Sequence, residues 1–320
     1  MECGHSFIKQ RKQSASFADF VGFHSLVVGK SNQQGLAEDE GICRTTLWSR
    51  FLPFFRYTIS SSEINALFPV KKAGGTWVLG LDGMWLHRFG VVMIYRDVAN
   101  QTNLWWSWQK SESYQNLSED FYQLYLLTQR RFPSGAISDW KGAIVALVAV
   151  FFPDIPHQRC LAHLVREGKK LLPLGSPFFF TLELRRIFQE IIFISDPSAY
   201  YDWSQKLEGW QKDYGYLLKV RSTSSETEKK WWYTHGNLRR AIRLLTKNQE
   251  CLFLYLHYNF LPKTNNSLEG INSQMKRRLG DHRGMPPQQQ IVFCFWALAF
   301  SRIKTRAELK KLWVYLKVRL

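Results

Sequence analysis

Apolar residues follow two different spacings along this chain, and the change lies near residue 76. From that point, apolar and β-branched runs follow one another with glycine and asparagine near the turns, at 76–86, 88–97 and 103–110. Three strands at this hairpin spacing predict an antiparallel meander.

Helices and short strands alternate after the meander. We expect an amphipathic helix over 118–131, a buried strand over 136–139, an apolar helix over 141–152, a strand over 157–163 and a helix over 164–172. Pro153 would end the apolar helix, because proline has no amide hydrogen to donate. The order predicts an α/β fold. Residues 177–260 then read as mostly helical, with further helices over 265–279 and within 288–320.

Before residue 76 the apolar spacing is helical. Two helices are expected, over 33–39 and from Arg44 onward, joined by a turn at Gly41-Ile42. The buried positions of a helix-turn-helix would be filled by Leu36, Ala37, Ile42, Leu47 and Phe51. The residues turned toward the major groove and its phosphates would be Arg44, Thr45, Thr46, Ser49 and Arg50. An ordinary helical hairpin is the alternative interpretation.

The first residues read as the second half of a zinc ribbon. Cys3 and His5 are too few to close a four-ligand site. We therefore interpret 1–32 as a remnant of a zinc-ribbon-like N-terminus, and the chain as a shortened copy of a longer protein. Residues 33–75 would hold the helix-turn-helix and a linker that ends in Lys71-Lys72-Ala73-Gly74-Gly75.

The charge of the chain indicates a polyanionic partner. Its 320 residues carry a net charge of +17, with an isoelectric point near 9.7. Neutralising phosphates releases counterions, so nucleic acid is the favoured partner, and an anionic membrane surface is the alternative. Aromatic residues make up 15% of the chain, including 13 Trp, and flat rings can stack on bases as well as pack a core.

The cysteines and the apolar runs indicate a cytoplasmic protein. The five cysteines are scattered and odd in number, which argues against a disulfide framework. The most apolar run, 142–153, is too short to span a membrane. We expect no membrane association, and for a bacterial chain an association with the nucleoid.

Three carboxylates stand out because of where they lie. Asp82 is inside an apolar strand, where an unpaired carboxylate is unfavourable. Asp139 ends the next central strand, and Glu269 lies on a helix that begins with Asn265-Asn266-Ser267. Carboxylates that converge from two strands and a helix suit hard divalent cations. We expect two Mg²⁺ ions, with Mn²⁺ as a substitute, set for in-line phosphoryl transfer.

Four motifs resemble the Mutator-like class of DDE transposases found in insertion sequences. They are Leu79-Gly80-Leu81-Asp82-Gly83, Ile137-Ser138-Asp139-Trp140-Lys141-Gly142, His157-Gln158-Arg159-Cys160-Leu161-Ala162-His163 and Thr264-Asn265-Asn266-Ser267-Leu268-Glu269-Gly270. The last, followed by Asn272, Lys276 and Arg283-Gly284, is the most specific. With their spacing they cover roughly 76–300.

The resemblance implies an RNase H-like core in which Asp82, Asp139 and Glu269 bind the catalytic metals. The core would occupy 76–176 and 261–320, interrupted by a helical insertion over 177–260. The implied activity is cleavage and strand transfer of double-stranded DNA, at element ends and target, by a homo-oligomer, a dimer on DNA.

The resemblance also gives Arg159, Cys160 and His163 a supporting role beside the catalytic acids. Cys-x-x-His supplies two ligands, and neither Cys3 nor Cys251 is placed to complete four, so we expect no structural zinc site. DNA would be held by Lys276, Arg277 and Arg278 after Glu269. In the insertion, Trp203, Trp210, Trp231 and Trp232 are candidates to stack on an unpaired base, and the alternative is that each is a core residue. The phosphates would be held by Lys229, Lys230, Arg239, Arg240 and Arg243.

Two other functions share these features. One is a catalytically inactive or regulatory DNA-binding relative that keeps the fold. The other is a nuclease that hydrolyses DNA with the same core but does not join strands. The presence of all three carboxylates favours catalysis.

Overall fold

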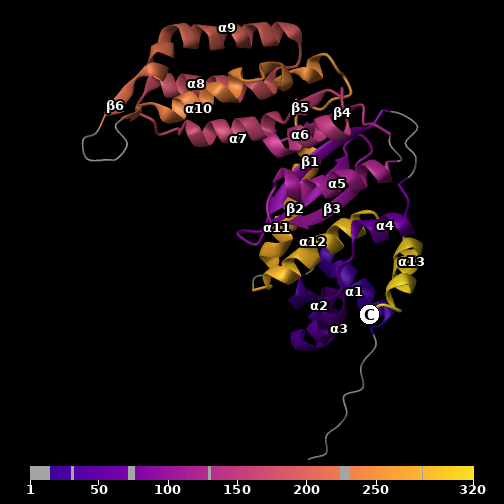
Figure 1. Cartoon of the computed structure of the whole chain (residues 1–320). Helices are drawn as coiled ribbons and strands as arrows, with labels where there is room; N and C mark the ends of the chain where they lie inside the picture. Colours follow the sequence, from indigo (N-terminus) through magenta and orange to yellow (C-terminus); the bar gives the residue numbers. More distant parts are fainter. Residues whose placement is uncertain (1–14, 30–31, 71–75, 129–130, 224–230, 283) are drawn as a thin grey trace, which may run out of the picture.

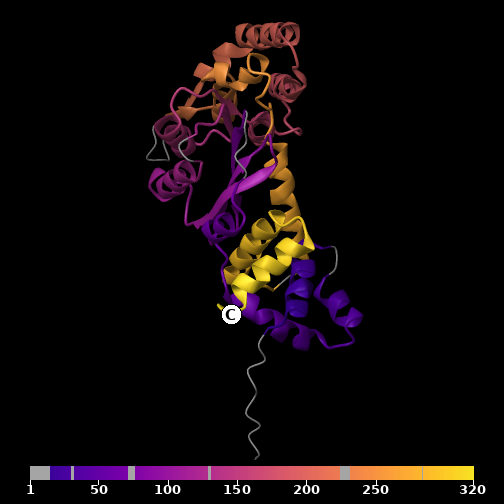
Figure 2. The ribbon, with the colours of Figure 1, turned by 90° about the vertical axis from the view of Figure 1, so that its right-hand side faces the viewer.

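The computed structural model describes residues 15–29, 32–70, 76–128, 131–223, 231–282 and 284–320. The molecule is elongated (Figure 1). A helical section lies at one end, a section built on a sheet lies in the middle, and a second helical section lies at the other end. The turned view in Figure 2 shows the same succession.

The middle section is a mixed five-stranded sheet in the order β3-β2-β1-β4-β5. Antiparallel pairing joins β1 (Val78–Trp85), β2 (Val91–Asp97) and β3 (Thr102–Gln109). The short strands β4 (Gly135–Ser138) and β5 (His157–Arg159) extend the sheet in parallel from β1. The α/β class and the meander are therefore confirmed. The second strand begins three residues later than predicted, because residues 87–89 form a turn that leads into Gly90 at φ +126°.

Helices cover both faces of the sheet. On one face, α5 (Tyr114–Leu127) and α6 (Gly142–Phe151) pack against Leu81, Met93 and Tyr95. On the other face, α11 (Asn266–Asp281) and α12 (Pro287–Ser301) share a core with Val92 and Ile94. Because side chains alternate along a strand, Asp82 faces the α11 side while Leu81 faces α5 and α6.

The N-terminal helices join this second core. They are α1 (Phe17–Val28), α2 (Gln33–Asp39), α3 (Arg44–Arg56) and α4 (Ser61–Leu67), and α13 (Arg306–Leu316) packs with them. The two helices of the predicted helix-turn-helix are present, with Gly41 at φ +64° in the turn between them. The interpretation of 1–32 as a remnant is wrong for 17–28. This segment is a helix capped by Ser16, and it buries Phe20 and Phe23. Cys3 and His5 lie outside the described residues, as does the 71–75 end of the predicted linker.

The region between β5 and α11 has a core of its own. Its helices are α7 (Leu161–Leu171), α8 (Phe179–Glu190), α9 (Pro197–Tyr214) and α10 (Gly236–Thr246), with short 3-10 helices η1 (Ile191–Phe193), η2 (Gly215–Lys219), η3 (Gln249–Leu252) and η4 (Leu254–Leu256). The predicted helical character is confirmed. A small antiparallel hairpin, β6 (Arg221–Thr223) with β7 (Trp231–Tyr233), was not predicted.

Two of the four tryptophans predicted to meet DNA belong to this core. Trp203 and Trp210 are each 2% exposed, and their indole N–H groups donate to the backbone carbonyls of Ile187 and Phe180. Their predicted contact with DNA bases is wrong, because neither ring has a face open to solvent. Trp231 and Trp232, on the hairpin, are 42% and 39% exposed. Lys229 and Lys230 lie outside the described residues.

Across the described parts of the chain, no helix combines the length and the apolar character needed to cross a bilayer.

Candidate active site

Asp82, within β1, and Asp139, directly after β4, lie on two neighbouring parallel strands. The register of β1 with β4 pairs Gly80 with Ile137, and two residues further along each chain come the two aspartates. Asp82 is 6% exposed, and its carboxylate accepts hydrogen bonds from the Gly83 backbone N–H at 3.0 Å and from Asn272 Nδ2 at 2.7 Å. Burial raises the pKa of Asp82 to about 6; the charge of Asp139 adds to this rise, whereas His163 opposes it.

Asp139 is held by the turn that follows β4. Trp140 takes a left-handed conformation at φ +69°, which turns the chain sharply after Asp139. Lys141 then folds back, with Nζ 3.1 Å from Asp139 Oδ2 and its backbone N–H donated to Oδ1 at 3.2 Å. The Asp139 carboxylate is thus fixed at the carboxyl end of β4, and Lys141 partly neutralises its charge.

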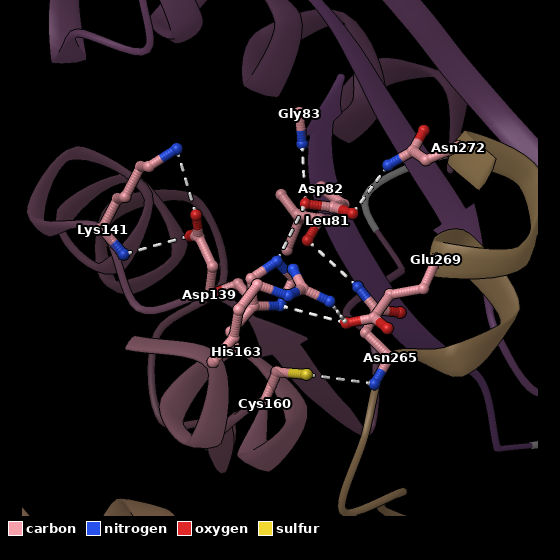
Figure 3. Close-up of polar contacts among 12 residues, drawn as sticks. Leu81, Asp82, Gly83, Asp139, Lys141, Cys160, His163, Asn265, Glu269 and Asn272 are labelled. Atoms are coloured by element: carbon pink, nitrogen blue, oxygen red, sulfur yellow. Dashed lines mark hydrogen bonds and ion pairs between the residues drawn. The ribbon is translucent and has the colours of Figure 1, made fainter. Parts of the chain in front are cut away.

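Glu269 comes to the same place from the first turn of α11. The start of this helix is tied to the sheet by Asn265, whose Nδ2 donates to the Leu81 carbonyl at 3.1 Å. Glu269 is half-buried, and its Oε1 lies 3.2 Å from Arg166 Nη2 on α7. The three acids named from the sequence therefore approach one another from two strands and one helix (Figure 3).

His163 lies between two of these acids. Its Nε2 is 3.8 Å from Asp82 Oδ1, and its Nδ1 is 3.5 Å from Glu269 Oε1. Burial lowers the pKa of His163, but the Cys160 thiol and the negative charges of Asp82 and Asp139 raise it by more. The strand predicted over 157–163 ends at Arg159, so His163 lies on the first turn of α7 and can reach across to α11.

Glu112 is a fourth carboxylate beside the site, and it was not predicted from the sequence. It lies in the loop between β3 and α5, with a side chain 5% exposed. Its Oε2 accepts hydrogen bonds from Lys141 Nζ and, at 3.0 Å, from Trp85 Nε1. Lys141 thus links Glu112 to Asp139. No motif surrounds Glu112 in the sequence, so only the fold reveals its position.

Cys160, His163 and Glu269 form a close group of potential metal ligands. One ligand atom from each lies within 4.8 Å of the other two. Cys160 directly precedes α7 and is buried, and its Sγ accepts the backbone N–H of Asn265 at 3.3 Å. These three residues could hold a metal ion. Cys-x-x-His supplies two of these ligands, and Glu269 on α11 supplies a third that the sequence did not indicate. The three carboxylates are not the set that lies closest together.

A basic cavity lies next to Asp139. It measures about 630 Å³, and its lining includes Trp140, Arg159, Arg240, Arg243 and Lys247. Arg159 is held in place by donating Nη1 to the Leu244 carbonyl at 3.1 Å and by pairing with Glu167 at 3.4 Å. Arg240 and Arg243 on α10 and Lys247 just after it are exposed, whereas Arg239 is half-buried and donates to the Leu218 carbonyl. Arg159, Arg240 and Arg243 were predicted from the sequence as functional residues, but their common cavity with Trp140 was not predicted.

The residues predicted to contact DNA from the helix-turn-helix are mostly open to solvent. Arg44, Thr45 and Ser49 are exposed on α3. Arg50 is half-buried and pairs with Glu40 at 2.9 Å. A smaller cavity of about 310 Å³ is lined in part by Arg44, Thr45, Trp48, Met285 and Gln289.

One of the three cations after Glu269 is not on the surface. Lys276 and Arg277 are exposed, but Arg278 is 4% exposed, donates to the Leu26 carbonyl of α1 and lies 3.5 Å from Asp281. It is three residues after buried Met275, which places it on the inner face of α11. The prediction that Arg278 contacts DNA is therefore wrong: it joins α11 to α1.

Comparison with known proteins adds no family to this description. No family model matches the chain, and no curated protein sequence matches it.

Proposed function

We propose that this protein is a DNA transposase in which Asp82, Asp139 and Glu269 bind two Mg²⁺ ions. The observation that carries the proposal is that these three acids come to one region of the fold, Asp82 from within β1, Asp139 from the end of β4 and Glu269 from the start of α11. The order β3-β2-β1-β4-β5, with three antiparallel and two parallel strands, is compatible with an RNase H-like core. The resemblance of the four motifs assigns the same three acids.

The chemistry of the site fits hard divalent cations. Asp82 is buried and Asp139 nearby is half-buried, and like charges in such surroundings are unfavourable without a compensating cation. Carboxylate oxygens are the ligands that Mg²⁺ prefers. Bound ions would supply an activated hydroxyl and charge stabilisation for the leaving oxygen.

The protein's own groups would hold and shape this site. Asn272 and the Gly83 amide fix the carboxylate of Asp82, and Lys141 fixes that of Asp139. Arg166, exposed beside Glu269, is placed to approach a DNA phosphate. Burial of Asp82 limits the access of bulk water to that side of the site.

Double-stranded DNA is the partner that the charges support. The net charge is +17, and exposed cations line the cavity beside Asp139. Arg44, Thr45 and Ser49 on α3 are available for recognition of the element ends. A dimer on DNA remains part of the proposal, because transposition must bring two ends together.

A plasmid assay tests the proposal. The substrate is a supercoiled plasmid that carries the DNA flanking this gene, incubated with the full chain and Mg²⁺, with a second plasmid as target. We expect nicking at the element ends and joined products. Nicking without joining would instead support the nuclease alternative, and DNA binding without nicking would support the inactive relative.

Asp154→Asn is a matched control for Asp139→Asn. Asp154 is exposed in a turn at φ +63°, a conformation that Asn also adopts readily. Its variant should nick the plasmid at the wild-type rate. Wild-type nicking by Asp139→Asn would rule out the two-metal site.

A further inference from the structure

We propose that Cys160, His163 and Glu269 form a binding site for Zn²⁺, with one coordination position left open. Binding of zinc does not rest on the proposed function. Its consequence does: an ion held here takes Glu269 away from Mg²⁺, so that zinc would inhibit Mg²⁺-dependent cleavage.

The geometry brings three side chains to one point. Cys160 and His163 are separated by two residues at the start of α7, which places them on the same side of the helix. Glu269 faces them from α11, and the ligand atoms of all three lie within 4.8 Å of one another. A tetrahedral zinc ion with ordinary bond lengths separates its ligands by roughly 3.3–3.8 Å. Contraction by at most about 1.5 Å is needed, and the half-buried Glu269 side chain can move by such an amount.

The ligand types select zinc rather than magnesium. Thiolate and imidazole are ligands for zinc, whereas Mg²⁺ prefers oxygen. Three protein ligands and an open fourth position are typical of zinc sites that exchange water or substrate. A site that combined these three residues would therefore differ in metal preference from the carboxylates a few ångströms away.

Two features of the polar atoms in this group support binding of a metal ion. Nδ1 of His163 is buried and has no hydrogen-bond partner among the described residues, although it faces Glu269. A metal ion would satisfy this nitrogen. On the other side, Cys160 Sγ accepts the backbone N–H of Asn265, a type of contact that orients a metal-bound sulfur.

Asp82 completes the surroundings of this site. Nε2 of His163 lies 3.8 Å from Asp82 Oδ1, so an ion on Nδ1 would leave the opposite ring nitrogen facing a carboxylate. Carboxylate–histidine–metal arrangements of this kind fix the ring and increase its basicity as a ligand. The imidazole would thus connect the zinc site to the first acid of the proposed Mg²⁺ site.

Cobalt substitution tests the site without DNA. The full chain, freed of metals, is titrated with Co²⁺, whose charge-transfer absorption reports a thiolate ligand, and then with Zn²⁺ in competition. We expect one equivalent with thiolate absorption in the wild type. Cys160→Ser should lose this absorption and bind Zn²⁺ more than tenfold more weakly, whereas Cys43→Ser, at an exposed thiol, should match the wild type. No thiolate absorption in the wild type would overturn the proposal.

Glu269→Gln is the second variant, since its partly exposed side chain can change without disturbing the core. It should keep the cobalt–thiolate absorption but weaken zinc affinity, because one charged ligand is lost. Unchanged zinc affinity in this variant would remove Glu269 from the site.

Inhibition of plasmid nicking by Zn²⁺ at fixed Mg²⁺ then tests the competition. Inhibition that rising Mg²⁺ relieves supports a shared Glu269, and nicking that persists with zinc bound overturns it. Failure of all nicking would count against the transposase proposal and leave the cobalt result intact.

Discussion

Asn272 Nδ2 donates a hydrogen bond of 2.7 Å to Asp82 Oδ2, from the second turn of α11 to the middle strand of the sheet. The contact joins the helix that carries Glu269 to the strand that carries the first acid. Because the Gly83 amide binds Oδ1, both oxygens of Asp82 are held. The carboxylate thus has one orientation before any metal arrives.

The substitution Asn272→Ala should disturb this orientation. We expect cleavage to slow by about 10- to 100-fold, the range seen when a group that orients a metal ligand is lost, while DNA affinity stays the same. The Mg²⁺ concentration needed for half-maximal rate should rise. A slower rate with unchanged Mg²⁺ dependence would assign Asn272 a merely structural role, and Asn272→Asp provides a charged comparison.

The three acids should be needed for cutting and not for binding. Asp82→Asn, Asp139→Asn or Glu269→Gln should each slow cleavage by roughly a hundredfold or more, since each removes one charged ligand. DNA affinity should hold or rise, because a negative charge near the phosphates is gone. Mn²⁺ should replace Mg²⁺, whereas Ca²⁺ should support assembly but little cleavage. Gel-shift and nicking assays on the same protein separate the two effects.

The stability of the metal-free protein should depend on the ionisation of Asp82. Its folded pKa of about 6 lies above the ordinary value of 3.8, so the folded state favours the protonated form. Stability from this group is full below pH 4 and is lost as the pH rises through 6. The loss relative to Asp82→Asn approaches roughly 3 kcal/mol for a shift of about two pKa units.

Urea unfolding of both proteins at pH 4 and pH 8 measures most of this difference. Mg²⁺ at pH 8 should restore part of the lost stability in the wild type and not in Asp82→Asn. A pH dependence equal in the two proteins would contradict the assignment to Asp82.

The basic cavity should contribute to DNA affinity through charge. Arg240→Ala and Arg243→Ala should each weaken binding for all DNA sequences and reduce the slope of log affinity against log salt by about one. Lys206→Ala is the control, because Lys206 is exposed on α9 in a pair with Glu190, outside the cavity. Equal salt slopes for all three variants would exclude the cavity from the DNA path.

Arg277 and Arg278 offer a matched pair on one helix. Arg278→Ala should lower the free energy of unfolding by about 1.5–3 kcal/mol, because it removes charged hydrogen bonds from a buried position, and should leave DNA affinity unchanged at temperatures where the variant is folded. Arg277→Ala should weaken DNA binding and leave the free energy of unfolding unchanged. Thermal unfolding and gel shifts give both quantities, and a stable, weakly binding Arg278→Ala protein would reverse this assignment.

Local patterns were enough to predict the sheet and the positions of Asp82 and Asp139. Alternating apolar residues determine the strands, and parallel strands bring their carboxyl ends to one edge. The position of His163 between Asp82 and Glu269 depends on how α7 and α11 approach each other, and no short-range pattern contains that information. Glu112 was missed for the same reason.

The errors came from residues whose role changes with burial. From the sequence, Trp203 was a candidate to stack on bases, but in the fold it is a core residue. Arg278 was a candidate to bind phosphate, but it is buried and donates a hydrogen bond to the Leu26 carbonyl. Charge and aromaticity alone do not say which face of a helix is inward. The helix over 17–28 was missed because the cysteine and histidine before it drew the interpretation toward a zinc ribbon.

The shared core of α1–α3 with α12 and α13 has a consequence for synthesis on the ribosome. Phe20 packs at a ring-centroid distance of 5.8 Å from Trp296, and the Trp296 indole donates to the Phe54 and Tyr57 carbonyls. The N-terminal helices are translated first but lack these partners until residues near 290–316 have emerged. The N-terminal helices therefore cannot complete their packing before the segment that carries Glu269 has also been made.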